Sequence, residues 1–312
     1  MPSSAPKSKR RRVIELAIDL GILVRRSAIV KAVRSFFDGL GFTEVETAVR
    51  IAAPAPEEHI DCPVVTGFSA SSTSVTYLRA SPELQMKKLL AAGMERIYQI
   101  GPCFREGENG SRHSSEFTML EWYRKGANYL DIMRDTVGLL SCLCGKEPCA
   151  FEYRELTVRE AYKRYAKWDP WEQWDVDRFD FDMATKIEPA LKELGGIVFL
   201  RDYPVQAASL SRINGDENCE SGRYAERWEL YWDGMELANC FTELCDPVEQ
   251  RCRFERSKAA RHQLNEADYP LDDAFLECLD NIGSAAGIAL GIDRLVMVLT
   301  KAKEISAVRT II

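Results

Sequence analysis

Arginines flank a polar loop in the first half of the sequence. Arg105 ends a segment with strand-like alternation, and Arg112-His113 stands near the far end of the loop. A guanidinium offers paired donors and a permanent charge, which suit phosphate oxygens. A third arginine, Arg294, stands where a strand is expected to pass into a helix. Each arginine alone is a weak signal because surface arginines are common, but together they would bind a polyphosphate.

A carboxylate stands among aromatic residues in the next expected strand, residues 116–123. Alternation places Phe117, Met119, Glu121 and Tyr123 on one face of that strand. Burial of a carboxylate without a partner costs on the order of several kcal/mol. We therefore expect Glu121 to receive a cation or several donors. The alternative is a sheet edge where Glu121 meets solvent.

A second hairpin brings further acids together. Glu229 and Glu236 flank an Asp-Gly turn at 233–234 and are expected to face each other on paired strands. Facing carboxylates repel unless a cation intervenes, so Mg²⁺ is one hypothesis and a Lys or Arg partner is the other. Asn239 and Glu243 are an odd number of positions from Glu236, so in a regular strand their side chains would point to the opposite face. If all of them line one pocket, the strand must bulge or end between 236 and 239.

The elements around these residues predict an α+β fold. Strands that neighbour each other as hairpins, with helices among them, favour a mostly antiparallel sheet flanked by helices. Neither of the glycine-rich nucleotide-binding motifs, Gly-x-Gly-x-x-Gly and Gly-x-x-x-x-Gly-Lys-Ser/Thr, occurs where a strand is expected to meet a helix. This argues against a doubly wound fold. Residues 128–195 are expected to be mainly helical, as an insertion. Expected strands are 42–47, 97–100, 103–106, 116–123, 197–200, 227–232, 235–241 and 287–290, and expected helices begin near 25, 82, 247, 271 and 292.

Composition fits one large globular domain. The 312 residues are 46% hydrophobic, and 41 Lys+Arg against 48 Asp+Glu give a net charge of −7. A nucleic-acid partner would therefore need a local basic patch, for which the arm at 1–12 is a candidate. The ten cysteines include no Cys-x-x-Cys pair, which favours reduced thiols in a cytoplasmic protein. Residues 13–24 are too short and too charged to cross a membrane.

Three separated segments resemble the motifs of class II aminoacyl-tRNA synthetases of the lysine-specific branch. Residues 41–47 resemble motif 1, residues 99–123 motif 2 and residues 287–294 motif 3, in family order. Across roughly residues 22–312 the chain is most similar to the elongation factor P lysine ligases, which are short paralogues of lysyl-tRNA synthetase. The resemblance implies the class II synthetase catalytic fold and a homodimer.

The resemblance also implies a domain plan. Residues 1–24 would form a partly disordered arm and short leading helix, and residues 25–312 the catalytic domain. The helical insertion would lie at about 128–195, and no OB anticodon-binding domain is expected. Ala48 replaces the usual motif 1 proline. Cys240 replaces a glycine beside Asn239, where its side chain could narrow the pocket.

ATP and Mg²⁺ are the cofactors that the resemblance implies. Arg105 and Arg294 would be the catalytic residues and bind the α- and γ-phosphates respectively. The further ATP-binding residues would be Arg112 on the γ-phosphate, His113 lining the site, Phe117 stacked on adenine, and Glu236, which with Glu229 would hold Mg²⁺. The family has a glutamate that contacts adenine early in the motif 2 loop, and this chain has Gly107 at that position, so either Glu106 or Glu108 replaces it or adenine is bound more weakly.

The implied substrate is lysine or (R)-β-lysine. The matching pocket residues are Glu83, Glu121, Tyr123, Asn239, Glu243 and Ala289. Ala289 stands where lysyl-tRNA synthetases have glycine and the ligases have alanine, a difference associated with (R)-β-lysine. The implied reaction is ligation of the amino acid to a lysine of elongation factor P. The alternatives are a truncated lysyl-tRNA synthetase, which the acidic charge disfavours, and a binding module without catalysis.

Overall fold

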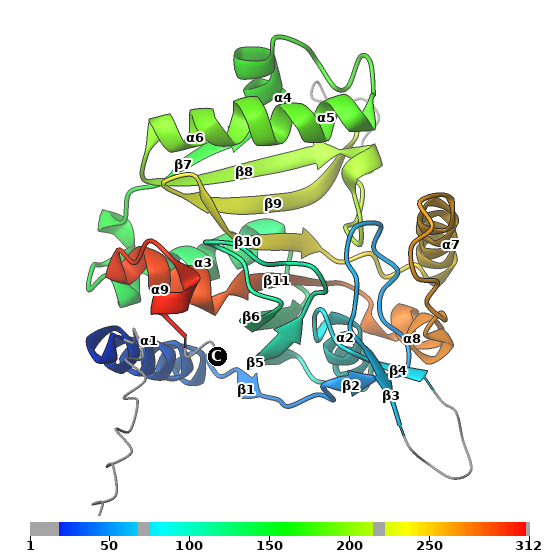
Figure 1. Cartoon of the computed structure of the whole chain (residues 1–312), viewed down its shortest axis with the longest axis horizontal. Helices are drawn as coiled ribbons and strands as arrows, with labels where there is room; N and C mark the ends of the chain where they lie inside the picture. Colours follow the sequence, from blue (N-terminus) through cyan, green and yellow to red (C-terminus); the bar gives the residue numbers. More distant parts are fainter. Residues whose placement is uncertain (1–18, 68–74, 215–221, 310–312) are drawn as a thin grey trace, which may run out of the picture.

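A sheet of eight strands runs through the centre of the molecule (Figure 1). The computed structural model describes residues 19–67, 75–214 and 222–309. In spatial order the strands are β1 (Thr43–Glu44), β5 (Arg96–Phe104), β6 (Glu116–Lys125), β11 (Ala285–Gly291), β10 (Met235–Thr242), β9 (Tyr224–Trp232), β8 (Ile197–Pro204) and β7 (Arg154–Thr157). A second sheet has the order β2 (Arg50–Ile51), β4 (Val75–Leu78), β3 (Val64–Thr66). The basic arm at 1–12 lies outside the described residues.

The pairing confirms the mostly antiparallel sheet. The six inner strands pair antiparallel, and the edge strands β1 and β7 pair in parallel with β5 and β8. The two segments expected at 97–100 and 103–106 are one strand, β5, and the segment expected at 42–47 is only two residues long in β1. β7 was not expected, because its partner in β8 is distant in the sequence and no local pattern reports such a pairing.

The helices begin largely where capping residues stand. They are α1 (Leu20–Gly39), α2 (Glu83–Ala91), α3 (Tyr129–Leu143), α4 (Val158–Ala161), α5 (Val176–Asp182), α6 (Glu188–Leu194), α7 (Pro247–Gln263), α8 (Asp273–Cys278) and α9 (Ile292–Thr300). Asn128 and Thr157 form the capping boxes of α3 and α4, and Asp246 caps α7. Asp19 caps α1, so this helix begins earlier than expected and crosses residues 24 and 25.

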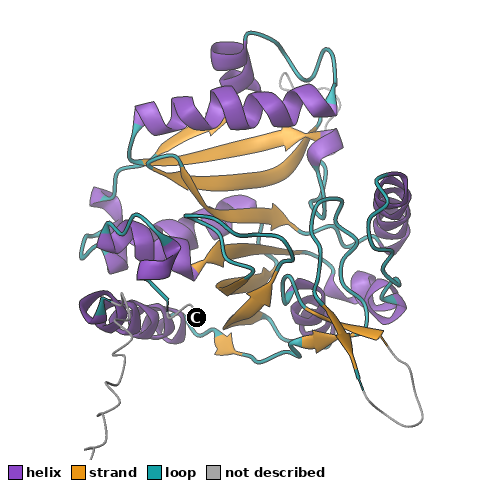
Figure 2. Ribbon diagram, viewed as in Figure 1, coloured by secondary structure: helices purple, strands orange, loops and turns teal. Residues whose placement is uncertain are grey.

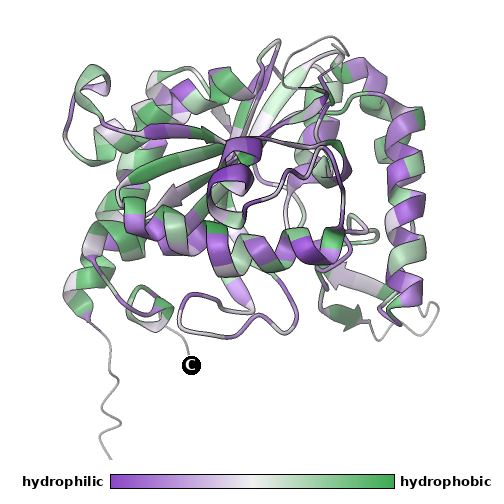
Figure 3. Cartoon of the chain, turned by 90° about the horizontal axis from the view of Figure 1, so that it is seen from above, coloured by the Kyte–Doolittle hydropathy of each residue, from purple (hydrophilic) through white to green (hydrophobic). Residues whose placement is uncertain are grey.

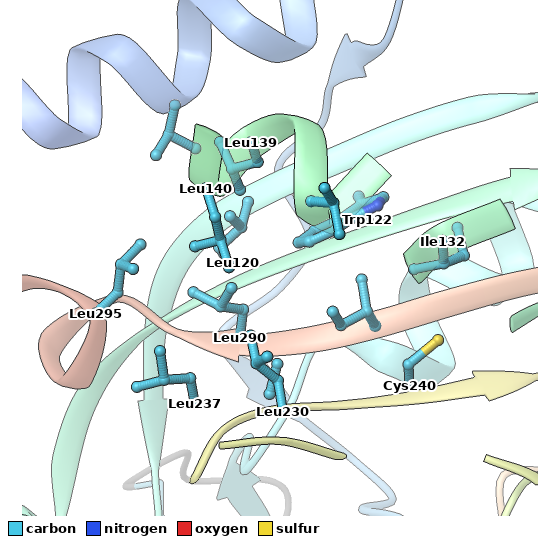
Figure 4. Packing of buried hydrophobic residues seen from close by; sticks show 14 of the residues in the cluster. Leu120, Trp122, Ile132, Leu139, Leu140, Leu230, Leu237, Cys240, Leu290 and Leu295 are labelled. Carbon is cyan, nitrogen blue, oxygen red and sulfur yellow. The ribbon is translucent and has the colours of Figure 1, made fainter. Parts of the chain in front are cut away.

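One face of the large sheet holds the main core (Figure 4). Leu120 and Trp122 of β6 pack there in one cluster with Leu290 of β11 and Leu230 of β9, and helices α1, α3 and α9 cover this face. In Figure 3 hydrophobic residues gather on the strands, whereas the outer helices mix both kinds. Cys240 is buried in this core. The expectation that it narrows the pocket is therefore wrong, because strand alternation turns it to the opposite face from Asn239.

The other face of the sheet is covered at its two ends (Figure 2). Helices α4 to α6 pack over Val198 and Leu200 at the β8 end, and α2 and α8 pack near Tyr123 at the β6 end. The part between them carries polar side chains and opens into a cavity. In the described residues, no helix is long and apolar enough to cross a membrane.

Candidate active site

The cavity has a volume of about 320 Å³ and lies on the face of the sheet opposite the main core. β6, β9, β10 and β11 form its floor, and the loop between β5 and β6 forms one wall. Among its lining residues are most of those that the sequence singled out: Glu83, Arg105, Glu108, Arg112, His113, Phe117, Tyr123, Glu229, Glu236, Asn239, Glu243, Ala289 and Arg294. Glu106 and Glu121 are the two that do not line it.

The three arginines meet at one end of the cavity. The guanidinium of Arg105 lies over the Phe117 ring at 5.2 Å from its centroid. Arg294 Nη1 donates to the Glu236 carbonyl oxygen at 2.9 Å, and its Nε lies 3.4 Å from the Arg112 carbonyl oxygen. These contacts hold the strand-to-helix junction of α9 against the β5–β6 loop. The cluster concentrates positive charge and guanidinium donors at this end, which suits phosphate oxygens.

The loop between β5 and β6 carries the two acids expected as candidates for contact with adenine, Glu106 and Glu108. Arg105 Nη1 lies 3.4 Å from Glu108 Oε1, and Glu108 lines the cavity. The Glu106 side chain is exposed and outside the cavity, so only Glu108 of the pair faces the site. Burial lowers the pKa of His113, and the charge of Arg294 lowers it further. A neutral imidazole therefore lines this end of the cavity near pH 7.

A bulge in β10 brings the hairpin acids to one face. The register shifts between Glu236 and Ala238, which confirms the irregularity that the parity of Asn239 required. Glu229 pairs with Asn239, and the two-residue turn already pairs Glu236 with Tyr231, so the expected opposition of Glu229 and Glu236 is wrong. Burial, and then the charge of Glu229, raises the pKa of Glu236. The two carboxylates are therefore close enough to repel each other.

Arg227 organises these acids, and the sequence did not single it out. Its Nη2 lies 2.5 Å from Glu229 Oε1, and its Nε donates to Asn239 Oδ1 at 3.1 Å. The guanidinium also stacks on Tyr203 at 4.3 Å from the ring centroid. The i, i+2 spacing of Arg227 and Glu229 on one strand was the available signal. For Glu229, the expected alternative of a Lys or Arg partner is therefore confirmed, and the partner is Arg227.

Glu229 and Glu236 also fit a Mg²⁺ ion that takes its remaining ligands from the phosphates of a bound nucleotide. Within the described residues, no group of three or more His, Cys, Asp or Glu side chains is placed to hold a metal ion. In nucleotide sites Mg²⁺ is usually held by one or two carboxylates and by the phosphates of the nucleotide. Glu229 and Glu236 repel each other beside the arginine cluster, which suits an ion completed by phosphate oxygens.

An acidic subsite occupies the other end of the cavity. Glu121 is completely buried and accepts hydrogen bonds from Ser81 Oγ at 2.7 Å and Tyr123 Oη at 2.8 Å. The expectation of several donors is met, and the solvent-exposed alternative is wrong. Burial, and then the charge of Glu83, raises the pKa of Glu121 to about 7. Glu121 lies directly behind the lining residues and holds the hydroxyl of Tyr123.

An internal ammonium group joins the other two acids of this subsite. Lys87 Nζ lies 2.5 Å from Glu83 Oε1 and 2.5 Å from Glu243 Oε2, and its side chain is 0% exposed. Although burial lowers it, the pKa of Lys87 is raised by the charges of Glu243 and Glu83. Burial raises the pKa of Glu243. The sequence signal for Lys87 was its i, i+4 spacing from Glu83.

β11 leaves room for the subsite. A Cβ on Gly287 would lie 2.1 Å from Tyr123 Cδ1 and 2.8 Å from Glu243 Oε1, so only glycine fits beside them. Ala289 pairs with Glu121 on one side and Asn239 on the other, and its methyl group lines the cavity. The floor of the cavity is thus built from small residues next to acidic ones.

Comparison with known proteins agrees with this arrangement. Residues 19–310 match the family model of the tRNA synthetases class II (D, K and N). The elongation factor P–(R)-β-lysine ligases of Proteus mirabilis and Pectobacterium atrosepticum are 35% and 34% identical, over 92% of this chain and 93% of each relative. The lysine–tRNA ligase of Listeria innocua is 34% identical over 90% of this chain and 62% of that protein.

Proposed function

The chain belongs to the class II tRNA synthetases (D, K and N), and we propose that it activates lysine or (R)-β-lysine with ATP and ligates it to elongation factor P. The observation that carries the proposal is one cavity with an arginine cluster at one end and buried carboxylates at the other. The first end suits a nucleotide and the second an alkyl ammonium group. Relatives named for this ligation match along nearly their whole length.

The first step needs no protein nucleophile. A carboxylate oxygen of the amino acid attacks the α-phosphorus of ATP, the bond to the leaving pyrophosphate breaks, and an aminoacyl-adenylate forms. Arg105 and Arg294 hold the phosphates and offset the charge that develops on them. Mg²⁺ held by Glu229 and Glu236 would neutralise the phosphates further. No general base is required, because the attacking carboxylate is already ionised.

The second step transfers the acyl group. The amine of a lysine side chain of elongation factor P attacks the acyl carbon, the bond to AMP breaks, an amide forms, and the amine releases a proton. The protein contributes mainly position: it holds the adenylate so that one face of the acyl carbon is open to the acceptor.

The acidic subsite supplies selectivity for the amino acid. A desolvated ammonium group needs carboxylates and a hydroxyl around it, which Glu243 and Tyr123 provide in the cavity wall, with Glu121 holding the Tyr123 hydroxyl from behind. A neutral side chain offers no charge to these acidic groups, so the subsite disfavours it. The same part of the cavity is lined by the methyl group of Ala289 and by Asn239, whose side chain is held by Arg227.

Charging of tRNA with lysine is the second candidate function. The similarity to lysine–tRNA ligases supports it. Amino-acid-dependent exchange of pyrophosphate into ATP, measured with lysine and with (R)-β-lysine, tests the activation that both functions share. We expect exchange with at least one of them. Its absence with both would leave only the non-catalytic binding module.

We further propose a cytoplasmic homodimer. All nine cysteines in the described ranges are unpaired, as in reducing compartments. α1 exposes Leu20 and Val24 by 72% and 71%, which suits a contact with a second copy. Light scattering of the purified chain gives the mass: a dimer is expected, and a monomer at micromolar concentration would contradict this part of the proposal.

A further inference from the structure

One carboxylate in the wall of the cavity has no role in the mechanism above. Glu57 lies in the loop between β2 and β3, lines the cavity, and is half-buried. Its carboxylate makes no hydrogen bond or ion pair with any residue that the structure describes, although Arg105 and Arg227 are among its electrostatic neighbours. A carboxylate partly withdrawn from water without a partner costs free energy, so its presence in the cavity wall needs a reason.

The loop that carries Glu57 is firmly anchored. Arg261 of α7 is buried, and its Nη1 donates to the Glu57 carbonyl oxygen at 2.8 Å. Its Nη2 lies 2.5 Å from Asp61 Oδ1, and the Asp61 carbonyl oxygen accepts from Glu106 N at 2.7 Å. Tyr269 Oη donates to the same carboxylate at 3.1 Å. The position of Glu57 is therefore set by its backbone, and its side chain is left free for a ligand.

Glu57 stands between the two ends of the cavity. Its neighbours are Glu83 of the acidic subsite and Arg105 of the phosphate-binding end. Burial, and then the charge of Glu83, raises the pKa of Glu57, whereas Arg105 and Arg227 lower it. A diamino acid that lies along the cavity would place its terminal ammonium in the acidic subsite and its carboxylate toward Arg105. Its second ammonium group then lies between them.

We infer that Glu57 is a specificity-determining residue that binds this second ammonium group, the one near the substrate's carboxylate, together with Glu83. One oxygen of Glu83 is already held by Lys87, so Glu83 alone offers little to a further cation. Glu57 supplies the free carboxylate. The inference rests on the proposed function and adds to it a residue that binds the ammonium group next to the carboxylate of the substrate.

The test is Glu57→Gln with Glu58→Gln as the matched control. Glu58 is the next residue in the same loop, is exposed, and does not line the cavity. In pyrophosphate exchange, Glu57→Gln is expected to raise the KM for lysine and (R)-β-lysine about 10- to 100-fold, the scale of a lost hydrogen bond to a charge. The KM for ATP stays constant, and Glu58→Gln matches the wild type.

A substrate analogue isolates the amine. 6-Aminohexanoate keeps the carboxylate and the terminal ammonium but lacks the second one, and its inhibition constant against lysine can be measured without turnover. We expect that Glu57→Gln leaves this constant unchanged within about twofold, since no charge-assisted bond is lost. Any of three results for Glu57→Gln overturns the inference: an inhibition constant of the analogue that rises as much as the KM for lysine, a raised KM for ATP, or an unchanged KM for both amino acids. Exchange absent already in the wild type is a failure of the proposed function instead.

Discussion

Lys87→Met removes the internal ammonium of the acidic subsite and keeps most of the volume of the side chain. Lys87 Nζ makes two contacts of 2.5 Å, to Glu83 and Glu243, from a fully buried position. Removal of one partner from a buried ion pair costs about 3–5 kcal/mol, because the remaining charge is left uncompensated. At about 2–4 °C per kcal/mol, the melting temperature should fall by roughly 10 °C. Urea unfolding and thermal melting at pH 7.5 measure this loss.

Lys88→Met is the control, because it removes the same atoms from the next position of α2. Lys88 pairs with Asp272 at 2.5 Å but is 27% exposed, and exposed pairs contribute about 0–1 kcal/mol. The pKa of Glu243 is already raised, and without Lys87 it rises further, so the folded variant binds more protons than its unfolded chain. The loss for Lys87→Met should therefore be larger at pH 8 than at pH 6. Equal, small losses for both variants would refute the reasoning.

Three further outcomes are expected. Arg294→Ala should lower exchange by about 100- to 1000-fold with an unchanged melting curve, and full activity would contradict its role on the phosphates. Since ionised Glu121 and Glu243 attract an ammonium, and their pKa values are raised to about 7 and about 8, the KM for the amino acid should rise as the pH falls from 8 to 6, with a weaker trend in Glu121→Gln. Ala289→Gly should shift the ratio of kcat/KM toward lysine and away from (R)-β-lysine by about tenfold, and an unchanged ratio would show that this methyl group does not select.

Local patterns predicted most of the fold. Alternation placed Phe117, Met119 and Tyr123 on the cavity face with Glu121 bonded to Tyr123 behind them, and a shared pocket for Glu236 and Asn239 required the irregularity seen in β10. Such signals depend on residues close in the sequence. The pairing of β7 with β8 depends on distant segments, and which face of β10 the buried Cys240 shares with the main core depends on the packing of helices from elsewhere in the chain.

The partners of the site residues were harder to foresee. Lys87 joins Glu83 to Glu243, which directly follows β10 and lies more than 150 positions from Lys87 in the sequence. Glu57 is positioned by a hydrogen bond from Arg261 of α7, which lies 204 positions away in the sequence. Motifs identify which side chains do chemistry, whereas the side chains that hold and neutralise them are decided by packing between remote elements.

The most direct test of the account is transfer of the activated amino acid. Wild-type protein, ATP, Mg²⁺ and labelled lysine or (R)-β-lysine are incubated with elongation factor P and tRNA from the same organism, together and separately, and each acceptor is analysed by mass spectrometry. We predict one added aminoacyl group on a lysine side chain of elongation factor P and none on tRNA. Label on tRNA alone would contradict the central claim.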